Sequence, residues 1–243
     1  AFGSHGPTQH FNPTAKGCDL RIAGRHLDHL RELGLGRDQF LLKPGRSLQL
    51  QRALSIGIEH PSCTAEGRQR HGRVLGALLG SATADHAPFA SPRTAWAEQD
   101  PADWWRASQD ALRSVLSQTG VAADAISCIG LSGQMHGAVL LDAAGAVLRP
   151  SIIWCDQRTE AECRWLDDTV GRERLLQLTS NPALTNFTLT KLLWVRRHEP
   201  DVWSRMRHVL LPKDYIRFQL SGEHAIDVAD ASGTLMLDVT QRR

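Results

Sequence analysis

The stretch that decides the fold is Ile129-Gly-Leu-Ser-Gly-Gln-Met-His-Gly-Ala-Val-Leu-Leu141. An apolar run that begins at Ala125 ends at Leu131, and its length and composition predict a buried strand. The polar, glycine-containing residues 132–137 predict a turn. The apolar residues 138–141 predict a second strand. The centre of the sequence is therefore a strand, a turn and a strand.

The turn has the composition of a ligand-binding loop. Gly133 and Gly137 carry no side chain, so the backbone can approach a ligand closely. Gln134 and His136 offer hydrogen-bond donors and acceptors, and Met135 adds an adaptable apolar contact. This combination suits a neutral polyhydroxylated ligand, which needs directional hydrogen bonds and little charge. A tight hairpin with one exposed histidine is the alternative interpretation of the same residues.

The sequence on both sides of this turn predicts alternating helices and strands. Asp100 is a good N-cap and Pro101 fits the first helical position, so a helix is expected from there to about Ser117, with Gly120 as its stop. Other expected helices are 159–170, 190–198 and 213–220, the expected strands are 147–154 and 208–211, and a strand, turn and strand are expected over 224–239. Such a mixture predicts an α/β domain.

The first third of the chain differs from the rest. Residues 1–80 hold 11 Lys and Arg against 6 Asp and Glu, whereas the remainder holds 17 against 20. All 7 Trp follow residue 95. Bulky anchors for a large core are therefore scarce before that point. Within the first third only a short helix over Ile22–Leu35 and a short strand over Leu54–Ile58 are expected.

Composition excludes several classes of protein. The 243 residues have a net charge of +2 and a mean hydropathy of −0.29. No apolar run reaches the length of a membrane-spanning helix, no secretory signal pattern is present, and no overall charge favours nucleic acid. The 5 cysteines form no CxxC pair, which argues against a disulfide scaffold or a zinc site and suits reduced thiols in a cytosol.

Further candidate residues receive structural roles. Asp156 is expected to cap a helix or to orient Arg158. Cys155 and Cys163 are expected to be ordinary buried or half-buried thiols. The pair His26 and His29 is most simply solvated surface, so no metal ligand is predicted. Leu192, Trp194 and Val195 are expected to form a core stripe.

Several strings of residues, in this order and spacing, resemble one known family. They are Trp96-Ala-Glu-Gln-Asp-Pro101 with Trp104-Trp105, Ile129 to Gly137, Trp154-x-Asp156-x-Arg158, Phe187-Thr188, Lys191-Leu-Leu-Trp-Val195, Leu210-Leu-Pro-Lys-Asp-Tyr215, Asp227-x-x-Asp230-Ala-Ser-Gly-Thr234 and Leu237-Asp-Val239. From Thr94 to Val239 the chain resembles the N-terminal domain of the FGGY sugar kinases, and within that family it is closest to the xylulose kinase branch.

The resemblance implies a fold and a reaction. The family has two ribonuclease H-like, actin-like domains with the sugar and ATP between them. The implied reaction is the ATP- and Mg²⁺-dependent phosphorylation of D-xylulose at O5, in which an aspartate accepts the hydroxyl proton. Met135 and His136 match the family's sugar-binding pair. The resemblance further implies a cytoplasmic enzyme with no nucleic-acid or membrane partner, and the family allows a dimer.

The sequence departs from the family at three places. Where an Asp-Leu-Gly-Thr phosphate loop is expected, the chain has residues 56–62, with Glu59 near the Asp position and Pro61 in place of flexible glycine. Asn186 stands where glycine is usual. The family's catalytic Asp lies beyond Arg243, so no catalytic residue is assigned, and ATP-site residues are unknown.

These departures define our expectations for the whole chain. Residues 1–72 are expected to be an atypical segment, disordered or read in a shifted frame, and residues 73–243 the family's N-terminal domain. The chain alone is expected to transfer little or no phosphate. A non-catalytic sugar-binding remnant, a kinase for another ketose or polyol, and a broken gene product without function are the alternatives.

Overall fold

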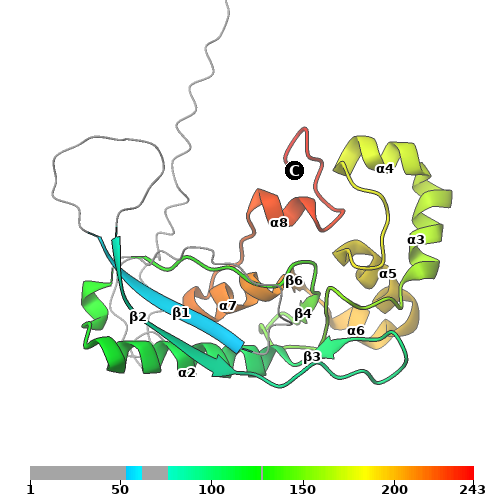
Figure 1. Ribbon diagram of the computed structural model, residues 1–243. Helices are drawn as coiled ribbons and strands as arrows, with labels where there is room; N and C mark the ends of the chain where they lie inside the picture. The colour runs from blue at the N-terminus through cyan, green and yellow to red at the C-terminus, as the bar shows by residue number, and fades with distance from the viewer. Residues whose placement is uncertain (1–52, 62–75, 127) are drawn as a thin grey trace, which may run out of the picture.

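The computed structural model describes residues 53–61, 76–126 and 128–243 (Figure 1). The helix expected over Ile22–Leu35, the pair His26 and His29, and most of the atypical segment 1–72 lie outside these residues. The described part is a mixture of helices and short strands, as the α/β prediction requires. No described helix is both long and apolar enough to cross a membrane.

The strands form three antiparallel pairs. They are β1 (Ala53–Pro61) with β2 (Gly76–Asp85), β3 (Glu98–Gln99) with β5 (Ser151–Ile152), and β4 (Val139–Leu141) with β6 (His208–Leu210). The strand expected over Leu54–Ile58 is therefore confirmed, and it is longer than expected. Because the pairing continues until Pro61 lies opposite Gly76, with one irregularity between Ile58 and Glu59, residues 56–61 are strand and not a phosphate loop.

The helices confirm most of the expected ones and add others. They are α2 (Pro101–Thr119), α3 (Glu160–Leu166), α4 (Arg172–Thr179), α5 (Thr188–His198), α6 (Pro200–Arg205), α7 (Pro212–Ser221) and α8 (Val228–Ser232), with a π-helical turn at Asp167–Gly171 and a 3-10 turn at Ala123–Ala125. The sequence did not predict α4 or α6. Pro200 follows the end of α5, as its sequence predicts, and it is also the first residue of α6.

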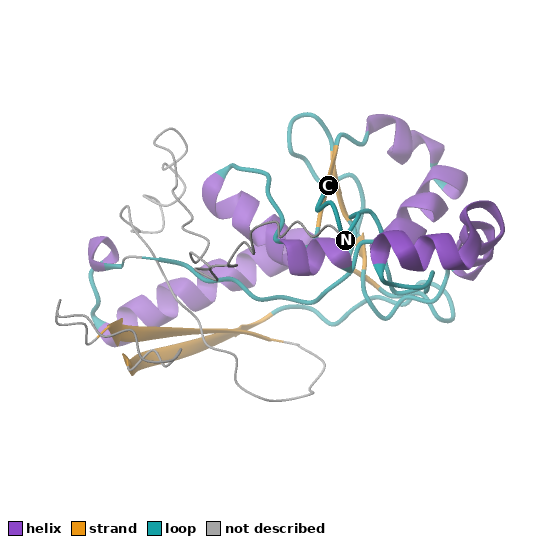
Figure 2. Cartoon of the chain, turned by 90° about the horizontal axis from the view of Figure 1, so that it is seen from above, coloured by secondary structure: helices purple, strands orange, loops and turns teal. Residues whose placement is uncertain are grey.

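Helix α2 shows how local chemistry sets the boundaries. The Asp100 carboxylate accepts a hydrogen bond from the Ala102 N–H at 2.9 Å and so caps the first turn. At the other end Gly120 has a left-handed backbone, and its N–H donates to the Leu116 carbonyl. Both ends agree with the prediction. The helix lies along the β1–β2 hairpin in both views (Figures 1 and 2).

One predicted strand is wrong. Within the run from Ala125 to Leu131, the first residue ends a 3-10 turn and Ile126 has an extended backbone. Residues 128–131 form no strand and pair with no described strand. The apolar character of the run has another cause, because Ile126 is buried in a core cluster with Ala111 and Val115 of α2. Apolar composition records burial, whereas a strand also needs a hydrogen-bonded neighbour.

The strand, turn and strand expected over 224–239 are also wrong. The Asp227 carboxylate accepts hydrogen bonds from the N–H groups of Ala229 and Asp230, both at 3.0 Å, and starts the short helix α8. An Asx cap of this kind favours a helical turn over an extended chain. Turns follow α8 to the end of the described chain.

The core beneath β4 confirms the predicted stripe on α5. Leu192, Trp194 and Val195 are buried together with Leu140 and Ile152. In a second cluster, Trp104 of α2 and Tyr215 of α7 are buried together with residues of β4 and β6. Cys163, on α3, is buried among apolar residues, and this burial raises the pKa of its thiol to about 11. That thiol and the half-buried Cys155 agree with the expected structural roles.

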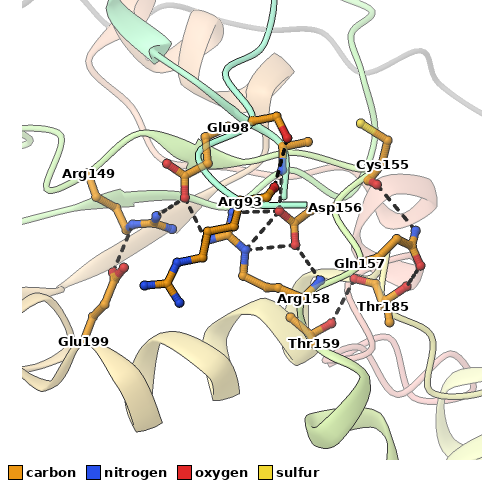
Figure 3. A network of polar contacts seen from close by, with 12 residues as sticks. Arg93, Glu98, Arg149, Cys155, Asp156, Gln157, Arg158, Thr159, Thr185 and Glu199 are labelled. Carbon is orange, nitrogen blue, oxygen red and sulfur yellow. Dashed lines mark hydrogen bonds and ion pairs between the residues drawn. The ribbon is translucent and has the colours of Figure 1, made fainter. Parts of the chain in front are cut away.

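A buried ion-pair network joins β3 to the segment after β5 (Figure 3). The Asp156 carboxylate is fully buried, receives the Ala97 N–H at 2.6 Å, and pairs with the Arg158 guanidinium at 2.7 Å. Arg158 also donates to Glu98 at 2.8 Å, and Arg149 pairs with the same carboxylate at 2.5 Å. Of the two roles considered for Asp156, orienting Arg158 is therefore the observed one.

Two indole rings complete the surroundings of Arg158. Its guanidinium carbon lies 3.7 Å from the ring centroid of Trp96 and 4.9 Å from that of Trp194. The two rings themselves meet edge to face at 5.2 Å. Planar guanidinium groups stack well on aromatic faces, which a lysine ammonium does not do. The Arg158 side chain is consequently 1% exposed, with its charge satisfied on every side.

We predict that this network stabilises the domain strongly. Arg158→Met would leave the buried Asp156 carboxylate and the half-buried Glu98 carboxylate without their shared partner, at a cost of about 3 kcal/mol in the free energy of unfolding. Urea titration followed by tryptophan fluorescence measures this change. Arg106→Met is the matched control, because Arg106 pairs with Asp103 on an exposed helix face and its loss should be barely measurable. Equal effects of the two substitutions would contradict the prediction.

Candidate functional site

The Gln-Met-His turn adopts a constrained backbone. His136 has φ = 61°, which is the left-handed region that non-glycine residues rarely enter. The Gly137 N–H donates to the Met135 carbonyl at 2.7 Å and closes the bend. Before the bend, the Gln134 side-chain amide donates a hydrogen bond to the side chain of the buried Gln99 of β3 at 2.7 Å. The predicted turn is confirmed.

The hairpin alternative does not describe this turn. After it, Ala138 bridges Ile152, and no described residue of the preceding segment pairs with the strand that follows. His136 is half-buried, and Met135 is 45% exposed. The two residues that the sequence singled out therefore differ in surroundings: one is held in the structure, and the other faces outward.

Helix α5 holds the turn from behind. The His136 carbonyl accepts hydrogen bonds from the Lys191 ammonium at 3.0 Å and from the Thr188 hydroxyl at 3.3 Å. The Lys191 ammonium also donates to the Asn186 carbonyl. The Asn186 backbone is not left-handed, so the structure shows no need for the glycine expected there.

Lys191 is the residue that the sequence reasoning missed. It is fully buried, and this burial lowers the pKa of its ammonium to about 7, against the opposing charge of Asp156. A signal was present in the sequence, since a lysine interrupts the apolar stripe of α5. In most lysines of this kind the aliphatic stem is buried and the ammonium lies in solvent. The Lys191 ammonium instead donates to two backbone carbonyls.

The imidazole of His136 packs into a confined space. Its ring meets Phe187 edge to face with centroids 4.7 Å apart. On another side lies Gly233, where an added Cβ would come within 2.6 Å of the ring's Cε1 and 2.9 Å of Nδ1. Burial, followed by the charge of Lys191, lowers the pKa of His136, although the Gly233 backbone and Asp230 oppose this. The ring is therefore neutral near pH 7.

The backbone after His136 also approaches its neighbours closely. A Cβ on Gly137 would lie 2.6 Å from Cγ of Pro212, the first residue of α7. Only glycine fits at this position without movement of the proline ring. The turn is consequently packed against α5, α7 and the end of α8 at once.

A charged cluster ties α7 to α8 beside the turn. The Lys213 ammonium pairs with Asp214 at 2.6 Å, Asp227 at 2.8 Å and Asp230 at 3.2 Å. Burial opposes the charge of Lys213, but the hydrogen bonds that its ammonium donates to Asp214 and Asp227 outweigh this and raise its pKa well above the usual range. The cluster fixes the loop that carries Gly233 against the helix that carries Lys213.

A cavity among the described residues does not coincide with the two predicted residues. It has a volume of about 460 Å³ and lies between β6, α7 and the residues around α8. Thr188, Asp214 and Thr234 line it, whereas Met135 and His136 do not. The two residues of the sugar-binding prediction therefore lie outside this cavity, where Met135 is exposed and His136 is half-buried.

The described residues do not provide a nucleotide or metal site that can be assigned. Across residues 76–126 and 128–243 and the strand 53–61, no group of His, Cys, Asp or Glu side chains is arranged to hold a metal ion. Residues 56–61, in the region where the phosphate loop is expected, are paired strand. Among these residues no side chain is therefore assigned to ATP or Mg²⁺.

Comparison with known proteins places these motifs in one family. The xylulose kinase of Escherichia coli K12 is 43% identical over 162 residues, which are 67% of this chain and 33% of the relative. The xylulose kinase of Klebsiella pneumoniae is 46% identical over 151 residues, 62% of this chain and 30% of the relative. The chain spans about a third of the length of the curated relatives it matches.

Solved structures agree with the fold. The xylulose kinase of Rhodospirillum rubrum has a TM-score of 0.63 at 33% identity, covering 70% of this chain and 35% of that one. The gluconate kinase of Lactobacillus acidophilus has a TM-score of 0.60 at 25% identity, covering 66% and 32%. The predicted fold class, that of the N-terminal domain of a sugar kinase, is confirmed.

The family model for the N-terminal domain of the FGGY carbohydrate kinases matches residues 75–243. That range contains every structural feature of the turn and of the residues that hold it. The chain belongs to the FGGY family of carbohydrate kinases, and the matched residues are its N-terminal domain.

Proposed function

We propose that this chain is the sugar-binding part of a kinase that transfers a phosphoryl group from ATP to O5 of D-xylulose. Curated relatives at 43% and 46% identity carry the name xylulose kinase, which favours this sugar over others. ATP and Mg²⁺ are the co-substrate and metal ion of the proposed reaction, and the cytoplasm is its proposed compartment. The proposed domain division is residues 1–72 and 73–243.

The observation that carries the proposal is the environment of His136. A ketose is uncharged and presents hydroxyl groups, so its recognition needs neutral hydrogen-bonding groups. The His136 ring is neutral near pH 7 because burial and the nearby Lys191 charge lower its pKa. Its Nδ1 is buried against Gly233, which leaves Nε2 to a hydroxyl of the sugar.

Met135 supplies the complementary surface in this proposal. Its side chain is 45% exposed beside the imidazole, and a flexible thioether adapts to the C–H face of a sugar. The same two residues would also suit another ketose or a polyol, which is the alternative. Since no aspartate of this sequence is assigned as the catalytic base, the decisive measurement is binding and not phosphoryl transfer.

We predict that the chain binds D-xylulose more tightly than D-ribulose or glycerol in titration calorimetry. His136→Ala should weaken D-xylulose binding roughly tenfold, since one hydrogen bond contributes on the order of 1–1.5 kcal/mol. His224→Ala is the control, because that exposed ring stacks on His208 and Phe218 instead and should leave the affinity unchanged. The absence of heat with any of the three ligands would refute binding by this chain.

A second prediction concerns Gly233. This residue has φ = −76°, so alanine causes no backbone strain there, and the added Cβ acts only by displacing the His136 ring. Gly233→Ala should weaken D-xylulose binding roughly as much as His136→Ala does, because the same hydrogen bond is lost. In the His136→Ala background the glycine substitution should have no further effect, as expected for two changes that act through one contact. Additive losses in the double variant would show that Gly233 acts elsewhere.

A further inference from the structure

The main chain of the turn, and not only its side chains, is fixed by a separate element. The carbonyl of His136 points away from the exposed face and ends on two side chains of α5, those of Lys191 and Thr188. A left-handed residue between Met135 and Gly137 is unfavourable unless its surroundings stabilise it. These two hydrogen bonds are the direct contacts that do so from the buried side.

Lys191 is suited to this role and to few others. It is fully buried, so it cannot touch a ligand on the face that presents Met135. Its ammonium donates to two main-chain carbonyls, those of His136 and Asn186, and therefore connects the turn to the loop before α5. A buried ammonium that lost an acceptor would be left unsatisfied, which opposes any rotation of the His136 peptide.

We infer that Lys191, assisted by Thr188, is a positioning residue that sets the affinity for the sugar by fixing the His136 peptide in its left-handed conformation. The inference rests on the proposed function, because its affinity measurement requires that the chain binds sugar. It adds that this affinity depends on Lys191, a residue that the sugar does not contact. The imidazole follows the peptide, so a rotated carbonyl would move the ring out of the space between Phe187 and Gly233.

The test compares two variants of α5 with a matched core variant, in the full 243-residue chain. Lys191→Met removes both hydrogen bonds of the ammonium at similar volume and should weaken D-xylulose binding roughly tenfold or more. Thr188→Val removes the single longer hydrogen bond and should weaken it roughly threefold. Val195→Ala is the control, since Val195 is fully buried on the same helix and packs in the core cluster under β4. It should lower the unfolding temperature and leave the affinity unchanged.

A second readout does not require sugar. The charge of Lys191 lowers the pKa of His136, whereas the Gly233 backbone and Asp230 raise it. In Lys191→Met the pKa of the His136 imidazole, followed by NMR titration of its Cε1–H signal, should therefore rise. In Val195→Ala it should not move. This measurement also separates failure of the proposed function from failure of the inference. A chain that binds no sugar refutes the proposed function, but the pKa of its His136 imidazole can still be measured.

Each result decides the inference. Affinity lost in both α5 variants and kept in Val195→Ala supports it. Lys191→Met with wild-type affinity and an unchanged His136 titration would overturn it, as would affinity losses that merely follow the unfolding temperature in all three variants. If Lys191→Met does not fold, Thr188→Val decides, and an unchanged affinity in that variant overturns the inference.

Discussion

The constraint on which this domain depends is the burial of a lysine ammonium beneath a turn. Lys191 has no access to water, so every hydrogen bond that its ammonium makes must come from the protein. Two main-chain carbonyls meet that need, and one of them belongs to His136. The left-handed conformation of His136 is what aims its carbonyl at the ammonium. The turn and the helix therefore determine each other.

The ion pairs beside α5 are subject to the same constraint, because their buried charges must also find partners within the protein. The Asp156 carboxylate opposes the loss of charge at Lys191, and it is itself held by Arg158 and the Ala97 N–H. Arg158 lies against Trp194, which is on the same helix as Lys191. Segments separated by many residues in the sequence thus satisfy one another's buried charges, and this interdependence favours a single arrangement of the site.

Local sequence chemistry predicted the elements that local chemistry controls. The cap at Asp100 and the stop at Gly120 define α2 without reference to any other part of the chain. The strand predicted from Ala125 to Leu131 is wrong, because a strand needs a hydrogen-bonded neighbour and apolar composition does not specify one. The strand, turn and strand expected over 224–239 do not form, because a side-chain cap at Asp227 starts a helical turn there.

The candidate site, like the fold, was predictable only where local sequence determines it. Glycines around a polar turn identified His136 as a candidate, but nothing local indicates which atoms stand behind it. Lys191 and Gly233 follow the turn by many residues, and their roles become visible only when the fold brings them to its carbonyl and its ring. Tertiary contacts of this kind have no period and no fixed spacing in a sequence. A residue type that conflicts with its local pattern, such as a lysine in an apolar stripe, is the signal that remains.

This arrangement separates two properties of the candidate site. Met135 is exposed, and a change there alters the surface offered to a ligand without disturbing a buried group. His136 is held by its carbonyl on one side and by its ring on the other, so a change there also affects the elements that hold it. Differences in ligand preference between members of such a fold are therefore physically easier to produce at the first position than at the second. The second position requires matching changes in α5 and in the loop at Gly233, because a different side chain must fill the same confined space.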